Sequence, residues 1–328
     1  MYTHGRLAIL FALVFAAISA APAQTPVSLK SPDGALELSI ATVRGQSVQE
    51  SGGQLAYRVA FRGKPVLDWS NLGLAIQGAP LLGSAVRVDS TKTSASDEAW
   101  NSIGSKANPI RDHYNAVTAQ TIETAPHGRR LAIEARAYND GVAFRYSIPE
   151  QPALQELRIT DEATQFRFHK DATTWSLILR DFQTSNEDDY HELTISGLHP
   201  EYLIGLPMLL EVPGTAWVGL TEAYIDDWAG LFVHTVGNPN VLTARLAPRV
   251  EDRNAPHLPW PIDPKLEPSM ISVLRQAPAR SPWRVLMIED DPGRLVESNI
   301  VVNLNPPCAI ADTSWVKPGK TAWDWWSG

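Results

Sequence analysis

Short stretches of alternating apolar and polar residues, each bounded by turn-forming residues, are the feature that most constrains this chain. The run 36–40 alternates after a Ser-Pro-Asp-Gly turn at 31–34, and the run 131–138 alternates before an Asn-Asp-Gly turn at 139–141. Strict alternation places apolar side chains on one face of a β-strand, and turns of this kind join antiparallel neighbours. The sequence therefore predicts antiparallel sheets with one buried face.

The alternating pattern continues to about residue 300. Further strands are expected where similar runs end at Pro, Gly, Asn or Asp, and these runs are 27–29, 55–61, 142–146, 175–179, 208–212, 217–221, 241–246, 270–274 and 283–288. Long helical periodicity is absent, and no repeat of fixed period occurs. Many strands without alternating helices favour a large sandwich of two sheets over a parallel fold. The lack of a repeat argues against a propeller.

Charge and cysteine content exclude several classes of protein. The chain carries 28 Lys and Arg against 36 Asp and Glu, which gives a formal charge of −8. Binding to nucleic acid needs clustered basic residues in excess, so no nucleic-acid partner is expected. The single cysteine, Cys308, can form neither an internal disulfide nor a thiolate zinc site. Stability must therefore come from the burial of apolar side chains.

The amino-terminal segment has the features of a secretory signal peptide. Residues 1–23 combine Arg6, an apolar run at 7–18 and small residues at the end. The apolar run is shorter than the ~20 residues that a membrane-spanning helix needs, so a membrane anchor is the less favoured alternative. No later segment reaches that length. The mature protein is expected to begin at residue 24, to lack a membrane span and to be periplasmic or secreted.

The character of the sequence changes near residue 303. Residues 303–320 contain a Pro-Pro pair and are predicted to be a linker. They lead into 321–328, which holds three tryptophans in four residues. Such a concentration of tryptophan would expose a large apolar surface if nothing covered it. The chain is therefore expected to stop at the start of a second domain.

The run 314–328, Ser-Trp-Val-Lys-Pro-Gly-Lys-Thr-Ala-Trp-Asp-Trp-Trp-Ser-Gly, resembles a segment of glycoside hydrolase family 97. In that family the segment joins an amino-terminal β-supersandwich to the first strand of a catalytic (β/α)8 barrel. Further runs that are similar to the family's amino-terminal domain lie at 31–34, 55–59, 70–74, 136–146 and 221–223. The resemblance implies an all-β, galactose mutarotase-like antiparallel supersandwich over 24–302, and the truncated start of a barrel at 321–328.

The resemblance also implies a function. The chain would be the amino-terminal portion of a calcium-dependent, exo-acting α-glycoside hydrolase of α-glucosidase or α-galactosidase type, acting on the terminal α-linked sugar of an oligosaccharide. Hydrolysis needs two carboxyl groups flanking the glycosidic bond, and in this family they lie in the barrel. A whole barrel takes about 250 residues, so no catalytic residue is expected here, and the chain's partner would be its own missing barrel domain. The alternative is a free-standing, non-catalytic carbohydrate-binding β-sandwich.

The densest acidic stretch, 185–192, is the candidate metal-binding segment. Members of the resembled family place a calcium-ligating glutamate in this region, and the family's pattern selects Glu187, with Glu192 as the alternative. Calcium takes about six to eight oxygen ligands, so the ion would need further ligands from the missing barrel. A solvated acidic loop without a metal is the competing interpretation.

The tryptophan-rich tail supplies the candidate substrate-binding residues. If 321–328 form the first barrel strand, Asp324, Trp325 and Trp326 could line the sugar pocket, with aromatic rings against the apolar sugar faces and a carboxylate bonding a hydroxyl. The alternative is that these residues only pack. Packing in the core or between domains is also expected for Trp69, Trp100, Trp175, Trp217, Trp228, Trp260 and Trp283.

Overall fold

The computed structural model describes residues 25–49, 51–124, 128–182, 184–249, 270–317, 319–320 and 322. The predicted signal peptide and the candidate residues Asp324, Trp325 and Trp326 lie outside the described residues. Within the described ranges, strands form sheets of five, thirteen and three strands, and all pairings between named strands are antiparallel. The predicted all-β, antiparallel class is confirmed.

The five-stranded sheet is built from the first strands of the chain. Its strands are β1 (Val27–Lys30), β2 (Leu36–Arg44), β3 (Ser47–Gln49), β4 (Gln54–Phe61) and β5 (Lys64–Asn71), in the order β1-β2-β4-β5 with β3 on β2. The predicted hairpin is present, because Val27 pairs with Ile40 in register. A two-residue turn joins β4 to β5, and its Arg62 and Gly63 both have positive φ, as such a turn requires.

The thirteen-stranded sheet contains most of the remaining strands. They are β7 (Val86–Trp100), β8 (Ile110–Glu123), β9 (Arg130–Tyr138), β10 (Gly141–Ile148), β12 (Gln165–Arg167), β13 (Thr173–Leu179), β14 (Tyr190–Thr194), β15 (Leu203–Val212), β16 (Ala216–Ala223), β17 (Leu231–Thr235), β18 (Val241–Leu246), β20 (Ala279–Arg280) and β21 (Trp283–Glu289). The main order is β12-β18-β17-β15-β16-β21-β10-β9-β8-β7, with β13 and β14 beside β15 and β20 beside β10. The small third sheet is formed by β6 (Leu74–Ile76), β11 (Glu156–Glu162) and β19 (Val273–Gln276).

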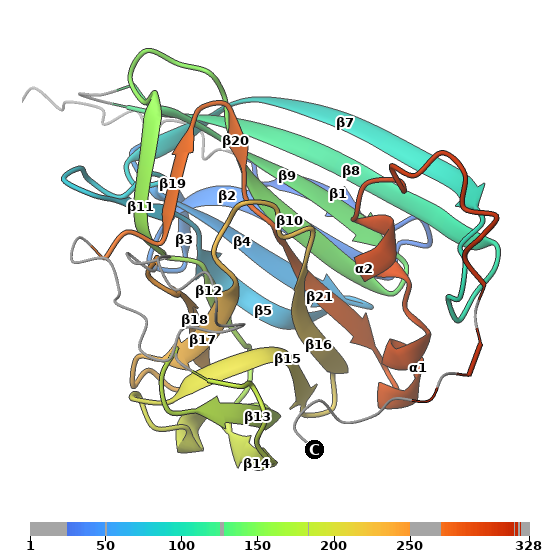
Figure 1. Cartoon of the computed structure of the whole chain (residues 1–328). Helices are drawn as coiled ribbons and strands as arrows, with labels where there is room; N and C mark the ends of the chain where they lie inside the picture. The colour runs from blue at the N-terminus through green and yellow to red at the C-terminus, as the bar shows by residue number, and fades with distance from the viewer. Residues whose placement is uncertain are drawn as a thin grey trace, which may run out of the picture.

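The main core lies between the two larger sheets. One face of β10 contributes Phe144 and Tyr146, and it packs against side chains of the five-stranded sheet such as Leu38 and Tyr57. The rings of Tyr57 and Phe144 meet with their centroids 4.6 Å apart. Figure 1 shows β2, β4 and β5 lying behind β10 and β21. The domain is thus a sandwich whose inner faces carry the alternating apolar residues.

Two short helices cover part of the outer face of the large sheet. They are α1 (Pro292–Glu297) and α2 (Ile300–Asn303), and both lie beside β21 (Figure 1). The side chain of Asp291 caps α1 by accepting a hydrogen bond from the Gly293 amide, 2.7 Å away. The predicted end of the sandwich at 302 falls inside α2, and Leu304 is buried against the sheet. The packed domain therefore extends to Leu304.

A buried ion network joins the small sheet to the large one. Arg284 of β21 is fully buried and donates hydrogen bonds to the Glu162 and Glu222 carboxylates, over 3.0 Å from Nε and 2.7 Å from Nη1 respectively. Glu162 also accepts a hydrogen bond from Thr164, which bonds the Tyr146 hydroxyl. The network thus connects the small sheet with β10, β16 and β21.

The two longest strands in the described ranges were not predicted from the sequence. β7 and β8 form a hairpin of 15 and 14 residues, and β7 is exposed along most of its length. The expected strand at 270–274 overlaps β19, which runs from Val273 to Gln276. No helix in the described ranges is long and apolar enough to cross a membrane.

Candidate functional site

The predicted metal-binding residues lie on and beside the hairpin formed by β13 and β14. Glu192 is on β14 and pairs in register with Trp175 of β13, whereas Glu187 lies in the loop that precedes β14. Thr174 and Ser176 point into the core and bond each other over 2.8 Å, which leaves Trp175 on the opposite, outer face. The hairpin thus holds Glu192 on the outer edge of the large sheet, with Glu187 beyond it.

Both candidate carboxylates are exposed. The loop is ordered by its own polar groups, because the Asn186 amide donates to Thr184 Oγ1 over 3.1 Å and the Asp189 amide donates to Asp188 Oδ1 over 2.8 Å. Across the described ranges, no three His, Cys, Asp or Glu side chains gather closely enough to hold a metal ion together. Carboxylate oxygens suit calcium, but the carboxylates of the hairpin do not converge on one point, so the hairpin alone does not provide the roughly six ligands that the ion takes.

A pair of stacked tryptophans lies next to Glu192. The rings of Trp175 and Trp217 are 5.4 Å apart between centroids, with 28° between their planes. Both side chains are half-buried on the outer face, where β13, β15 and β16 run side by side. The other tryptophans divide differently: Trp69, Trp228 and Trp283 are buried as expected, Trp100 is 39% exposed, and Trp260 lies outside the described residues. Exposed aromatic surface therefore lies beside the candidate metal-binding hairpin.

A second polar cluster crosses the outer face of β8, β9, β10 and β21. The Arg136 guanidinium lies between the rings of Tyr114 and Trp283, 4.2 and 5.2 Å from their centroids. Arg145 covers the same Trp283 ring at 4.4 Å. We call Tyr114, Arg136, Trp283 and Arg145 the arginine–aromatic stack. It was not predicted from the sequence, since it depends on β21 pairing with β10, which lies about 140 residues earlier in the chain.

Glu134 anchors one end of the arginine–aromatic stack. Its carboxylate accepts hydrogen bonds from Arg145 Nε over 2.8 Å and from Arg280 Nε over 3.0 Å. Burial alone would raise the pKa of Glu134, but the charges of Arg145 and Arg280, together with hydrogen bonds from Arg145 and Ser147, outweigh burial and lower it. The carboxylate is therefore held ionised between two guanidinium groups.

Glu134→Gln is expected to lower the free energy of unfolding by about 1–3 kcal/mol at pH 7, because two arginines lose a charged partner. A depressed pKa in the folded state adds stability above the unfolded pKa of about 4.3, and this contribution is lost as the pH falls through the folded value. The deficit should therefore shrink between pH 7 and pH 3 in urea denaturation. Glu37→Gln, at an exposed pair with Lys30, should cost at most about 1 kcal/mol. Equal deficits for Glu134→Gln at both pH values would contradict this assignment.

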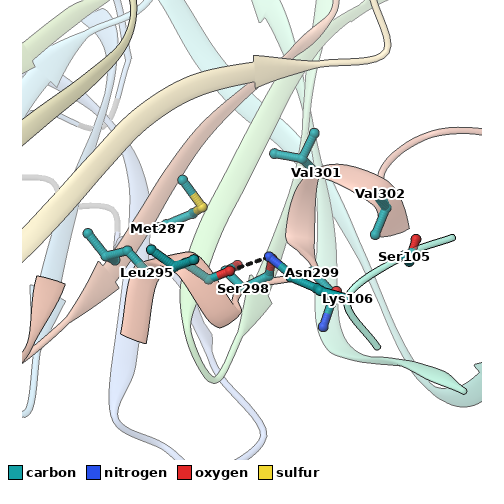
Figure 2. Close-up of a pocket in the computed structure, with 9 residues that line it drawn as sticks. Ser105, Lys106, Met287, Leu295, Ser298, Asn299, Val301 and Val302 are labelled. Atoms are coloured by element: carbon teal, nitrogen blue, oxygen red, sulfur yellow. Dashed lines mark hydrogen bonds between the residues drawn. The ribbon is translucent and has the colours of Figure 1, made fainter. Parts of the chain in front are cut away.

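The pocket in Figure 2 is of a different kind. It has a volume of about 400 Å³ and lies between the β7–β8 connection and the two short helices, with Met287, Leu295 and Val301 among its lining side chains. Lys106 donates hydrogen bonds to the carbonyl oxygens of Val296 and Ser298 and so binds the carboxyl end of α1. Most of the side chains that line this pocket are apolar, and no carboxylate is among them.

The fold defines this protein as a large antiparallel β-sandwich domain with a polar and aromatic outer face. The family model described as Glycosyl-hydrolase 97 N-terminal matches residues 29–307. The chain therefore belongs to the glycoside hydrolase family 97 amino-terminal domain family, as the sequence motifs predicted.

Curated relatives and solved structures agree with this membership. The chain is 26% identical over 315 residues to a retaining α-galactosidase of Bacteroides thetaiotaomicron, and the match covers 93% of this chain and 45% of the relative. A probable retaining α-galactosidase of Streptomyces bingchenggensis is 26% identical, with 84% and 38% covered. A family 97 enzyme from Pseudoalteromonas sp. strain K8, solved in complex with acarbose, matches with a TM-score of 0.75 and 25% identity, covering 89% of this chain and 40% of that one. This chain thus spans less than half the length of these relatives.

Proposed function

We propose that this chain is the amino-terminal portion of a calcium-dependent, exo-acting α-glycoside hydrolase. The observation that carries the proposal is the family match over 29–307, together with relatives that are named as hydrolases and are more than twice as long as the match. The names of the curated relatives favour an α-galactosidase. An α-glucosidase is the alternative, because the Pseudoalteromonas enzyme was solved in complex with acarbose. The carboxyl pair that hydrolysis needs would lie in the part of the relatives that this chain does not cover.

In this proposal the β13–β14 hairpin contributes a ligand to a shared calcium site. Glu187, or alternatively Glu192, would supply a carboxylate, and the remaining ligands would come from the catalytic barrel. A bound divalent cation polarises and orients the oxygens that it coordinates. Strand pairing would fix the position of Glu192, because β14 pairs with β13, which in turn pairs with β15. Glu187 would be supplied by the loop that leads into β14. Asp324, Trp325 and Trp326, at the expected start of the barrel, stay predicted substrate-binding residues.

The proposal also includes export of the protein from the cytoplasm. Residues 1–23 would direct the chain out of the cytoplasm and be removed, which leaves a periplasmic or secreted protein. An oligosaccharide substrate is consistent with that location, because such sugars are met outside the cell. Mass spectrometry of the mature protein tests this point, and an intact amino terminus on the exported protein would contradict it.

The purified chain, residues 24–328, is expected to show no turnover of nitrophenyl α-galactoside or nitrophenyl α-glucoside in the presence of calcium. The physical reason is that a glycosidase needs both carboxyl groups beside the glycosidic bond. The release of nitrophenol is the measurement. Glu187→Gln and its matched control Asp188→Asn, in the same exposed loop, extend the test. Turnover that Glu187→Gln abolishes and Asp188→Asn preserves would overturn the proposal, because it would place the catalytic apparatus within this chain.

A further inference from the structure

A second cavity opens at the opposite end of the molecule from the β13–β14 hairpin. It has a volume of about 520 Å³ and lies at the ends of β10 and β19, beside β20 and the segment that leads from β16 to β17. Figure 1 shows β19 and β20 at one end of the sandwich and β13 and β14 at the other. Cavities that bind small molecules have volumes of roughly 300–1,000 Å³, so this one is large enough for a ligand. The cavity is not part of the candidate calcium site at the β13–β14 hairpin.

Tyr224 lines this cavity in a strained conformation. Its φ is +56°, a left-handed value that a bulky side chain rarely adopts. Such a conformation costs about 1–3 kcal/mol and persists only where the surrounding structure imposes it. Here the half-buried ring packs against the cluster that contains Ala223 and Trp283. The fold thus sets one aromatic ring firmly in the cavity wall.

Two arginines of the cavity wall are held in place from behind. Arg280 Nε binds Glu134 over 3.0 Å, while its side chain is 61% exposed. Arg275 Nη1 donates to the carbonyl oxygens of Asp226 and Asp227, over 3.1 and 3.2 Å. A guanidinium group carries five N–H donors, so each arginine keeps donors that these contacts do not use. The arginine–aromatic stack therefore extends, through Glu134, into the cavity.

Groups of both charges line the cavity. Arg275 and Arg280 share the cavity wall with the exposed carboxylates of Glu150 and Asp226, and Ser147 adds a hydroxyl. Each arginine also has its own carboxylate partner, which is Asp227 for Arg275, over 3.2 Å, and Glu134 for Arg280, over 3.0 Å. An anionic ligand would meet two carboxylates, and a cationic ligand would meet two guanidinium groups. A neutral molecule rich in hydroxyl groups suits both, because each hydroxyl donates and accepts hydrogen bonds. The Tyr224 ring adds the apolar surface against which the C–H face of a sugar can pack.

From this geometry we propose that the cavity is a saccharide-binding site on the sandwich domain. It would hold one end of an oligosaccharide through Tyr224, Arg280 and the carboxylates of the cavity wall. The choice of an α-linked saccharide as the ligand rests on the proposed function. The site itself rests on the cavity, the groups of both charges that line it and the imposed conformation of Tyr224.

The test is isothermal titration calorimetry of the chain, residues 24–328, with melibiose and with maltotriose, in the presence of EDTA. At least one saccharide is expected to bind, and Tyr224→Ala and Arg280→Ala should each weaken its affinity about tenfold or more. Arg62→Ala is the matched control, because Arg62 is a similarly exposed arginine with a carboxylate partner, Asp290, outside the cavity. The affinity of Arg62→Ala for the saccharide should equal that of the wild type.

Three results would overturn the proposal. They are the absence of binding by either saccharide, equal affinity in the wild type and both cavity variants, and tight binding of inorganic phosphate in place of sugar. Arg280→Ala keeps the test decisive if Tyr224→Ala perturbs folding, because the Arg280 side chain is largely exposed. Turnover plays no part in this measurement, and EDTA removes calcium. A failure here is therefore distinct from a failure of the proposed hydrolase function.

Discussion

Arg284→Ala is expected to lower the free energy of unfolding by about 3–5 kcal/mol, because removing one partner of a buried ion network leaves charge without compensation. Arg284 is fully buried, as is its partner Glu162, and its second partner Glu222 is 12% exposed. In the variant, two carboxylates would face each other across an apolar core without a cation between them. Urea denaturation measures the loss.

The pH dependence of that loss provides a second readout. Burial raises the pKa of Glu222 above its usual value, although Arg284 opposes this effect. Without Arg284 the pKa of Glu222 should rise further. A raised carboxyl pKa favours the folded state only while the group is protonated, and that contribution is lost as the pH rises through the folded value. The deficit of Arg284→Ala should therefore be larger at pH 8 than at pH 5.

Arg62→Ala is the control for Arg284→Ala. The Arg62–Asp290 pair is equally short, at 2.7 Å, but its side chains are 54% and 44% exposed. Exposed pairs contribute about 0–1 kcal/mol, so this variant should unfold almost as the wild type does. If Arg284→Ala were no more costly than Arg62→Ala, the buried network would not stabilise the sandwich in the way described.

Gly141→Ala is expected to cost about 1–3 kcal/mol through overpacking. A Cβ at Gly141 would lie 2.5 Å from the carbonyl oxygen of Leu286 and 2.9 Å from the Cα of Met287, both on the neighbouring strand β21. It would also lie 2.7 Å from Cδ1 of Ile300, on α2. Backbone atoms of a paired strand cannot move aside, so β10 and β21 would have to separate. Thermal and urea unfolding would report the change.

Gly219→Ala is a closely matched control, because Gly219 and Gly141 both pair in register with Met287 from opposite sides. At Gly219 the nearest atom to an added Cβ is the terminal methyl of Met287, 2.8 Å away. That methyl ends a flexible side chain that can adopt another rotamer. The cost should stay within about 1 kcal/mol. Equal costs at the two glycines would show that crowding by the β21 backbone is not the cause.

The sequence predicted strands at many, though not all, of the runs in which alternation reflects burial; β17, with its alternating buried residues, was missed. The runs at 131–138 and 142–146 became β9 and β10, because their apolar residues face the other sheet. The β7–β8 hairpin escaped prediction because β7 is largely exposed and rich in Ser, Thr and charged residues. Such a strand is held in place by backbone hydrogen bonds to its neighbour. Because these bonds do not depend on side chains, the sequence shows no alternation of apolar residues. The helices α1 and α2 are too short for helical periodicity to show.

Single residues of the candidate site were predictable, but their arrangement was not. The acidic run and a family motif directed attention to Glu187 and Glu192, and the structure places both at the β13–β14 hairpin. Neither clue reveals that Trp175 stacks on Trp217, because those strands are joined through β15. The saccharide cavity depends in the same way on tertiary structure, since the φ of Tyr224 and the position of Arg280 follow from packing.

The place of β21 in the large sheet constrains how this protein is made in the cell. β21 lies between β10 and β16, and it is the last strand in the described part of the chain. During translation, the nascent polypeptide therefore carries two half-sheets with open edges until residue 289 leaves the ribosome. Open strand edges invite pairing with other chains. Synthesis of this domain should accordingly depend on chaperones that shield those edges until the final strand arrives.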